Sequence, residues 1–334
     1  MRIAINGFGR IGKLVFRAFL EKKLKNIEVV AINELGSLDS SIHLLKFDSI
    51  HGTLPSKIIR TKSGIAIGKN KIKFFTERDP KNLPWKLLNI DVVLECSGVF
   101  TSKESAIAHI NAGAKKVIIS APASNVDKTI VQGVNNEELN KKHNIISNGS
   151  CTTNCLAPLA MVLDANLGID SGFMTTIHSY TGDQRTVDQG HKDLRRARAA
   201  AESMIPTSTG AAKALSLVLP KLEGRLDGTA IRVPTPNVSL IDFTFISKIK
   251  TNSEKINSIV TKASKLKKLK NILTINNLPL VSVDFNHNSS SSIFDTTQTQ
   301  VVKGKFCRVL SWYDNEWGFS NRMIDTLIDL KRFI

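Results

Sequence analysis

The segment INGFGRIG, residues 5–12, constrains the fold more strongly than any other part of this sequence. It follows an apolar run, RIAIN (2–6), and opens a helical pattern, and its glycines have the G-x-G-x-x-G spacing of a dinucleotide-binding turn. In such a turn Gly7 permits the tight bend, Gly9 lets the backbone approach a pyrophosphate, and Gly12 brings helix and strand together. Alone, the motif is equally compatible with a glycine-rich turn that binds nothing.

An acidic residue follows at the distance that nucleotide binding requires. The next predicted strand, IEVVAIN (27–33), leads into Glu34, about 22 positions past Gly12. A carboxylate there can accept hydrogen bonds from ribose hydroxyls and repels a ribose phosphate, which predicts NAD in preference to NADP. Later strand ends, CSG (96–98) and SAP (120–122), are expected at the same carboxyl edge of the sheet.

The pattern of the chain changes near Gly149. Before it, short β-branched runs alternate with helical stretches, which predicts a doubly wound parallel sheet of the Rossmann type covered on both faces. Those runs are 2–6, 27–33, 91–98, 116–122 and 144–148. After it, longer alternating runs predict an α+β domain with a mostly antiparallel or mixed sheet, and helices at 151–166, 210–219 and 253–270. The stretch NHNSSSS (286–292) is interpreted as a surface turn.

Composition limits the remaining possibilities. A chain of 334 residues predicts about two domains, and its four cysteines are too few and too scattered for a disulfide framework. Neither a signal peptide nor an apolar membrane span is recognisable, so a cytoplasmic protein is expected. The net charge of +17 raises the possibility of nucleic-acid binding, but the lysine-rich stretch 253–270 has apolar residues at helical spacing and is most simply an amphipathic helix.

The segment SNGSCTTNC (147–155) allows three interpretations of its two cysteines. A structural zinc site needs about four ligands in paired spacing, which the sequence lacks, so we expect no metal. A stable disulfide is not expected in a reducing compartment. The alternatives left are a buried, unreactive pair and a nucleophile. Ser150 is a plausible N-cap, which would put Cys151 at a helix start where the dipole favours thiolate, while Cys155 is better placed for packing.

A thiol nucleophile also requires a base. Among the seven histidines, His178 in TTIHSYTGDQ is the best candidate, because it ends an apolar strand among small polar residues. The sequence supplies no distance between the two side chains.

Six segments together resemble phosphorylating glyceraldehyde-3-phosphate dehydrogenases of bacterial type. They are INGFGRIG, SCTTNCLAPLA, HSYTGDQRTVD, HKDLRRARAAAESMIPTSTGAAKA, RVPTPNVS and SWYDNEWGFSNR. The similarity covers essentially the whole chain in one collinear order. It implies an NAD-binding domain at 1–149, joined by a C-terminal helix at 316–334, and a catalytic domain at 150–315.

The resemblance implies a covalent mechanism. Cys151 would add to the aldehyde of glyceraldehyde 3-phosphate, with His178 as the base, and hydride would pass to NAD. Inorganic phosphate would then cleave the thioester to give 1,3-bisphosphoglycerate. A homotetramer is also implied, in which residues 187–201 reach toward the cofactor of a neighbouring subunit.

The same resemblance assigns binding roles to further residues. The substrate phosphate would contact Thr181, Arg196 and Arg232, and the attacking phosphate would contact Ser150, Thr152, Thr209 and Gly210. The cofactor contacts would be Gly7, Gly9, Arg10, Ile11, Gly12, Glu34, Arg78, Ser97, Ser120, Asn315 and Phe319.

Departures from the family pattern affect cofactor choice more than chemistry. Gln189 and Gly190 replace a common Leu-Pro pair, and Glu34 replaces the commoner aspartate, so strict NAD preference is less firmly implied. The nearest rival function is erythrose-4-phosphate dehydrogenase, whose matching segment usually lacks the pair formed here by Thr209 and Gly210. Nucleic acid is not expected as the primary partner, because pure binding has no use for a nucleophile.

Overall fold

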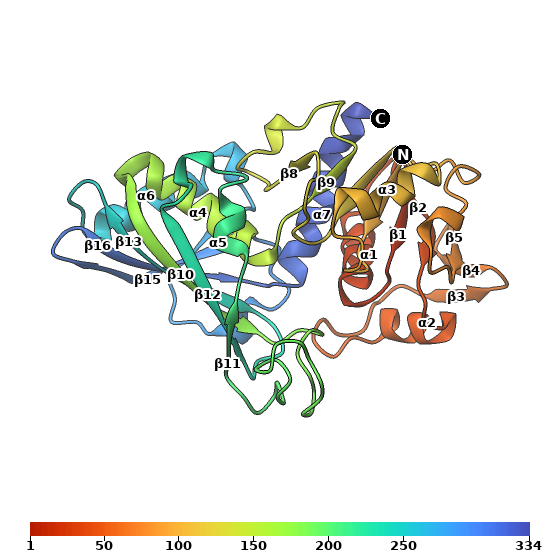
Figure 1. Cartoon of the computed structure of the whole chain (residues 1–334), viewed down its shortest axis with the longest axis horizontal. Helices are drawn as coiled ribbons and strands as arrows, with labels where there is room; N and C mark the ends of the chain where they lie inside the picture. Colours follow the sequence, from red (N-terminus) through yellow and green to blue (C-terminus); the bar gives the residue numbers. More distant parts are fainter. The chain divides into compact units, whose positions relative to one another are not determined.

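The computed structural model describes residues 1–334, which form two compact units. The first unit consists of 1–130, 135–149 and 320–334, and the second of 131–134 and 150–319. Each unit contains one sheet (Figure 1). None of the helices has both the length and the apolar character needed to cross a membrane.

The first unit is built on a nine-stranded sheet in the order β3-β4-β5-β2-β1-β6-β7-β9-β8. From β5 to the β8 edge of the sheet, each strand pairs in parallel with the next, as predicted. At the other edge, β3 pairs with β4 and β4 with β5 in antiparallel fashion, which the sequence patterns did not indicate. The strands are β1 (Arg2–Asn6), β2 (Glu28–Asn33), β3 (Ile58–Thr61), β4 (Gly64–Ile67), β5 (Asn70–Phe75), β6 (Val92–Glu95), β7 (Lys116–Ile119), β8 (Lys128–Thr129) and β9 (Ile145–Ser147).

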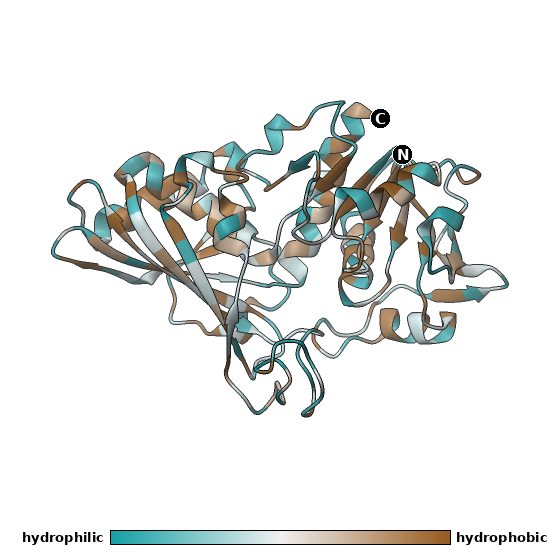
Figure 2. Cartoon of the chain, in the orientation of Figure 1, coloured by the Kyte–Doolittle hydropathy of each residue, from teal (hydrophilic) through white to brown (hydrophobic).

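Both faces of this sheet are covered. Every residue of β6 and β7 is buried. Because neighbouring side chains in a strand point to opposite faces, this burial means that both faces are covered. Figure 2 shows hydrophobic residues, in brown, along the strands around β1, and hydrophilic residues, in teal, on the helices and the connections. The helices that accompany the sheet are α1 (Arg10–Lys22), α2 (Leu38–Lys46) and α3 (Lys103–Asn111), with short 3-10 turns at Pro80–Asn82, Asn136–Glu138 and Lys331–Phe333. Helix α7 (Trp317–Leu330) begins in the second unit and ends in the first.

The glycine-rich turn joins β1 to α1 as the sequence predicts. Gly7 has φ of 85° and donates its N–H to the carbonyl of Asn33, 2.9 Å away, at the end of β2. A Cβ on Gly12 would overlap the carbonyl oxygen of Gly7, whereas a Cβ on Gly9 would meet nothing within 4 Å. Gly12 is therefore required for the close packing of helix on turn, and Gly9 leaves an open surface.

The second unit is built on a seven-stranded mixed sheet in the order β11-β12-β10-β13-β16-β15-β14. Neighbours pair in antiparallel fashion except β10 with β12 and β14 with β15. The strands are β10 (Ile169–Ser179), β11 (Ile205–Ser208), β12 (Leu226–Val233), β13 (Ser239–Ser247), β14 (Leu273–Asn276), β15 (Ser292–Val302) and β16 (Phe306–Tyr313). The helices are α4 (Cys151–Leu167), α5 (Ala211–Leu215) and α6 (Ser253–Ser264), with 3-10 turns at Pro220–Leu222, Lys267–Leu269 and Ser282–Phe285.

Helix α4 is the centre of the second unit. It contacts α5, α6 and four strands of the sheet, and twelve of its seventeen residues are buried. Cys155, Leu156, Leu159 and Leu163 all have zero exposure. A helix buried on so many sides has little freedom to move relative to the sheet, because protein interiors are packed as densely as organic crystals.

Two sequence predictions in this unit are wrong. The lysine-rich stretch is not one helix, because α6 ends at Ser264 and Leu266, whose backbone is extended, is 53% exposed. The 3-10 turn that follows brings Leu269 to full burial instead, so the core contact is kept without the helix. The predicted surface turn at 286–292 is present only at its start, where Asn286 and His287 form an exposed turn. The prediction is wrong for its last three serines, because Ser290, Ser291 and Ser292 are buried and Ser292 begins β15.

We expect Gly12→Ala to lower the free energy of unfolding by about 1–3 kcal/mol, because the new methyl group would force helix α1 away from the Gly7 carbonyl. Gly9→Ala is the matched control, since its methyl group has open space. Urea unfolding of both variants at the same pH measures the difference. Equal stabilities would show that the turn relaxes freely around Gly12.

Candidate active site

The two neighbouring cysteines have different environments. Cys151 is the first residue of α4 and is half-buried, and the predicted N-cap is confirmed because the Ser150 hydroxyl accepts the Thr153 N–H at 3.0 Å. Cys155 lies one turn further along, has zero exposure, and contacts the Ser292 hydroxyl at 3.7 Å. Burial raises the pKa of Cys155 to about 12. Cys155 is therefore a packing residue, and Cys151 is the thiol available for chemistry.

The structure places the predicted base beside the predicted nucleophile. The Cys151 sulfur lies 3.5 Å from Nε2 of His178, which is the next-to-last residue of β10. The imidazole ring packs edge-on against the ring of Tyr313, with centroids 5.9 Å apart. A sulfur and a ring nitrogen at this separation are within reach of proton transfer.

Burial sets the charge state of this pair. Desolvation raises the pKa of the Cys151 thiol, and the positive charge of Arg232 and the amide of Thr152 offset only part of that effect. Burial and the nearby Arg232 charge lower the pKa of His178 to about 3. Burial therefore opposes the effect of the helix dipole and disfavours charge on both members of the pair.

Arg232 is the cation closest to this pair. It lies opposite His178 in the parallel pairing of β12 with β10, and its Nη1 is 2.7 Å from His178 Nδ1 and 3.1 Å from the carbonyl oxygen of Ser179. The same carbonyl lies 2.7 Å from Nδ1, so Nδ1 has both a donor, Arg232, and an acceptor, Ser179, within reach, and these contacts admit either tautomer. In the tautomer that donates Nδ1–H to Ser179, the Nε2 lone pair faces the sulfur. Nε of Arg232 is buried without a hydrogen-bond partner. This unused donor fits an anion that approaches from the site.

Two residues near the pair are tied down by hydroxyl groups. The side-chain oxygen of Asn315 accepts hydrogen bonds from Ser179 and Ser239, each at 2.8 Å, which directs its NH₂ group away from them. The Thr152 hydroxyl lies 2.9 Å from the Tyr313 hydroxyl, which is also 2.8 Å from that of Thr176. Sequence reasoning missed Tyr313. The available signal was its position at the end of a predicted strand, directly before the turn that contains Asn315.

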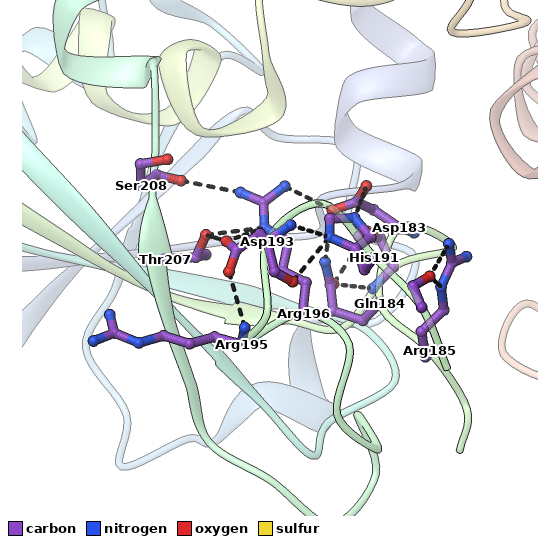
Figure 3. A network of polar contacts seen from close by, with 11 residues as sticks. Asp183, Gln184, Arg185, His191, Asp193, Arg195, Arg196, Thr207 and Ser208 are labelled. Atoms are coloured by element: carbon purple, nitrogen blue, oxygen red, sulfur yellow. Dashed lines mark hydrogen bonds and ion pairs between the residues drawn. The ribbon is translucent and has the colours of Figure 1, made fainter. Parts of the chain in front are cut away.

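Arg196 belongs to a polar network in the irregular segment between β10 and β11 (Figure 3). Its guanidinium contacts Asp183 at 2.7 Å and Asp193 at 3.3 Å, and its Nε donates to the Thr207 hydroxyl at 2.9 Å. Thr181 lies at the start of the same segment and donates its N–H to Gln184 at 2.9 Å. Arg196 is therefore neutralised by carboxylates here, unlike Arg232.

The remaining predicted residues of the second unit lie at the starts of two helices, α5 and α7. Gly210 is the N-cap of α5, and the Thr209 hydroxyl accepts the Ala211 N–H at 3.2 Å. Phe319 is buried, with 5% exposure. Arg198, one of the neighbouring arginines not selected for the site, pairs with Asp188 at 2.9 Å on the surface.

The first unit contains a cavity of about 370 Å³ at the carboxyl ends of its strands. Five of the predicted cofactor residues line it: Gly7, Gly9, Glu34, Arg78 and Ser97. Both oxygens of Glu34 accept backbone N–H groups, from Phe8 at 2.6 Å and Gly36 at 3.1 Å, which fixes the acid at the rim. The open space over Gly9 and the fixed carboxylate fit a dinucleotide.

The six other predicted cofactor residues do not line the cavity: Asn315 and Phe319 belong to the second unit, and four belong to the first. Ile11 and Gly12 lie within α1, and Arg10, at its first position, pairs with Asp48 at 2.5 Å. Ser120 follows β7 and donates its N–H to the Glu95 carbonyl at 2.9 Å. The cavity also includes Cys96, from the segment CSG expected at this edge, and Phe100, which was not predicted.

A dinucleotide-binding sheet together with a cysteine–histidine pair defines the class of NAD-dependent oxidoreductases that act on aldehydes. Residues 1–103 match the glyceraldehyde 3-phosphate dehydrogenase NAD binding domain, and residues 150–315 match the C-terminal domain of the same family. The chain therefore belongs to the glyceraldehyde-3-phosphate dehydrogenase family, and its cofactor is NAD.

Similar proteins extend over the whole chain. A glyceraldehyde-3-phosphate dehydrogenase of Xanthobacter flavus is 57% identical over 328 residues, which is 98% of each chain. One of Cereibacter sphaeroides is 54% identical over 334 residues, covering 100% of this chain and 99% of the relative. One of Zymomonas mobilis is 52% identical over 333 residues, or 99% of each.

The lowered pKa of His178 predicts acid sensitivity. In the folded protein the His178 ring stays neutral down to about pH 3, whereas in the unfolded chain it binds a proton below its ordinary pKa of about 6.5. The free energy of unfolding therefore falls as the pH drops from about 6.5 toward 3. At pH 5 the loss is about 2 kcal/mol. Urea unfolding between pH 7 and pH 5 measures it, and His178→Asn should flatten the curve by about this amount. Parallel curves for the two proteins would contradict the assignment.

Proposed function

We propose that this protein oxidises D-glyceraldehyde 3-phosphate with NAD and inorganic phosphate, giving 1,3-bisphosphoglycerate and NADH. The observation that carries the proposal is the 3.5 Å approach of the Cys151 sulfur to His178 Nε2. A neutral thiol next to a neutral base can form the nucleophilic thiolate when the substrate reacts, so no charged group has to be kept in the buried site beforehand. The cavity of the first unit supplies the residues that would hold NAD.

The first half of the reaction attaches the substrate to Cys151. The sulfur forms a bond to the carbonyl carbon of the aldehyde, and the thiol proton passes to Nε2 of His178. Nε2 then gives that proton to the carbonyl oxygen, so the product is a neutral hemithioacetal and His178 is again a neutral base. NAD, when bound, supplies the two-electron acceptor for the hydride that leaves C1. His178 takes the hydroxyl proton as the carbonyl of the thioester forms.

The second half releases the acyl group to phosphate. An oxygen of inorganic phosphate attacks the thioester carbonyl, the carbon–sulfur bond breaks, and Cys151 recovers its proton from His178. The thioester keeps the free energy of oxidation available for the acyl phosphate. Water must therefore compete poorly with phosphate at this site.

Two anion sites support this sequence of steps. Arg232, with its unpaired Nε, would bind the phosphate of the substrate together with Thr181 and Arg196. Ser150, Thr152, Thr209 and Gly210 would bind the attacking phosphate through hydroxyl and backbone N–H groups. A phosphate dianion on Arg232 would also offset the charge that lowers the pKa of His178, so substrate binding would strengthen the base.

Cofactor contacts beyond the cavity are also proposed. Asn315, whose side-chain NH₂ is directed outward by two serines, would bind the nicotinamide amide, and Phe319 would pack beside the ring. Arg10, Ile11 and Gly12 would contact the pyrophosphate through the start of α1. Ser120 would complete the set. We further propose a cytoplasmic homotetramer, as the family resemblance implies.

Erythrose-4-phosphate dehydrogenase remains the alternative, and it is not favoured. Thr209 and Gly210 provide a hydroxyl and a backbone N–H for an attacking phosphate, which a hydrolytic enzyme does not need.

The first test follows NADH absorbance with glyceraldehyde 3-phosphate, with and without phosphate or arsenate. We expect turnover only with one of these anions, and Cys151→Ser to lower kcat by at least a factor of about 1,000 because the nucleophile is lost. Cys155→Ser is the matched control and should retain activity. Faster, phosphate-independent oxidation of erythrose 4-phosphate would instead establish the alternative.

The second test concerns the substrate phosphate. We expect Arg232→Gln to lower kcat/KM for glyceraldehyde 3-phosphate about 100-fold or more, and to have a much smaller effect on unphosphorylated glyceraldehyde. Arg308→Gln, which removes an arginine paired with Asp242 on the same sheet, is the control. Equal losses for the two aldehydes would show that Arg232 acts on the chemical step and not on phosphate recognition.

A further inference from the structure

A buried carboxylate lies beneath the cofactor cavity of the first unit. Glu95 is the last residue of β6 and is 1% exposed. It accepts four hydrogen bonds: from Asn6 Nδ2 at 2.6 Å, His109 Nε2 at 2.8 Å, Ser97 N–H at 2.8 Å and the Ser97 hydroxyl at 2.5 Å. A buried carboxylate is tolerated only when its oxygens are satisfied in this way.

The direction of the hydrogen bond from His109 is fixed by a tryptophan. His109 and Trp85 both have zero exposure, and the indole Nε1 lies 3.1 Å from His109 Nδ1. An indole N–H can only donate, so Nδ1 must hold a lone pair and Nε2 must hold the proton. His109 is therefore a neutral donor to an ionised Glu95, and neither group is used by the chemistry of the second unit.

On its other side Glu95 is connected to the walls of the cavity. Asn6, which donates to Glu95, accepts a hydrogen bond from Asn33 Nδ2 at 2.7 Å. The side-chain oxygen of Asn33 then accepts the Glu77 N–H at 2.9 Å. Asn6, Asn33, Glu77 and Ser97 all line the cavity. One hydrogen-bonded chain thus fixes three strand ends and the loop after β5.

Ser97 is the link between Glu95 and the glycine-rich turn. Both of its donors are directed to Glu95, and its hydroxyl oxygen accepts the Val99 N–H at 3.1 Å. A Cβ on Gly7 would overlap the backbone of Ser97, so these two segments are in direct contact. A displacement of Ser97 would therefore displace the turn that faces the pyrophosphate.

We propose that Glu95, held by His109, is a positioning residue that sets the shape of the NAD-binding cavity. Its carboxylate fixes the Ser97 loop and Asn6 in the arrangement that accepts the cofactor. The hydroxyl of Ser97 is committed to this network, so its contribution to NAD binding is the loop conformation and not a direct donor to the cofactor.

The test is Glu95→Gln in the full-length protein, with NAD affinity measured by calorimetry. Because every partner of Glu95 is a donor, the amide NH₂ must face at least one N–H or O–H group. We expect the Kd for NAD and the KM for NAD to rise tenfold or more, while the KM for glyceraldehyde 3-phosphate and the rate of Cys151 alkylation by iodoacetamide stay within twofold. Glu28→Gln, which removes an exposed carboxylate in the same unit, is the control.

A second pair of variants keeps the proposal testable if Glu95→Gln does not fold. His109→Gln retains an N–H for Glu95 and should raise the Kd for NAD less than threefold, whereas His109→Leu should raise it tenfold. The Kd for NAD is measured well below the unfolding temperature of each variant. An unchanged Kd in Glu95→Gln or in His109→Leu would overturn the proposal. Parallel losses of NAD affinity and Cys151 alkylation would also overturn it, because they would indicate a general effect on folding.

Discussion

The packing of α4 against the seven-stranded sheet is the constraint on which the chemistry depends. The helix is buried along most of its length, and Ser150 caps its first turn, so the position of the Cys151 sulfur is determined by the core of the second unit. His178 is fixed independently, in the strand β10, by its place in the sheet. Because both elements are rigid, the 3.5 Å contact needs no flexible loop to form it.

Burial has opposite effects on the two partners, and this decides the form of the chemistry. It raises the pKa of Cys151 and lowers that of His178, so a thiolate–imidazolium pair is disfavoured at rest. Arg232 is the charge that can change this balance, since it contacts the imidazole and still has a free donor for an anion. If Arg232 binds the substrate phosphate as proposed, substrate recognition and activation of the nucleophile are coupled through one guanidinium group.

Local patterns predicted much of the fold and failed where long-range contacts decide. The first parallel strands, the glycine-rich turn and the N-cap at Ser150 were predictable because each depends on neighbouring residues. The helix predicted at 253–270 ends at Ser264, and the serines at 290–292 are buried, because core packing overrides local composition there. Tyr313 and Glu95 were missed since their partners, such as Thr152 and His109, are distant in sequence or belong to other elements.

The sequence by itself determined the chemistry available to this protein: a dinucleotide-binding turn, an acid at Glu34, a candidate nucleophile at Cys151 and a candidate base at His178. These depend on residue types and short spacings, which are fixed along the chain. Only the tertiary structure decided the distance between sulfur and imidazole, the charge state of that pair, and the Glu95 network. Those properties depend on burial and on contacts between distant segments, because desolvation and hydrogen bonding are set by the surroundings of a group and not by its neighbours in the sequence.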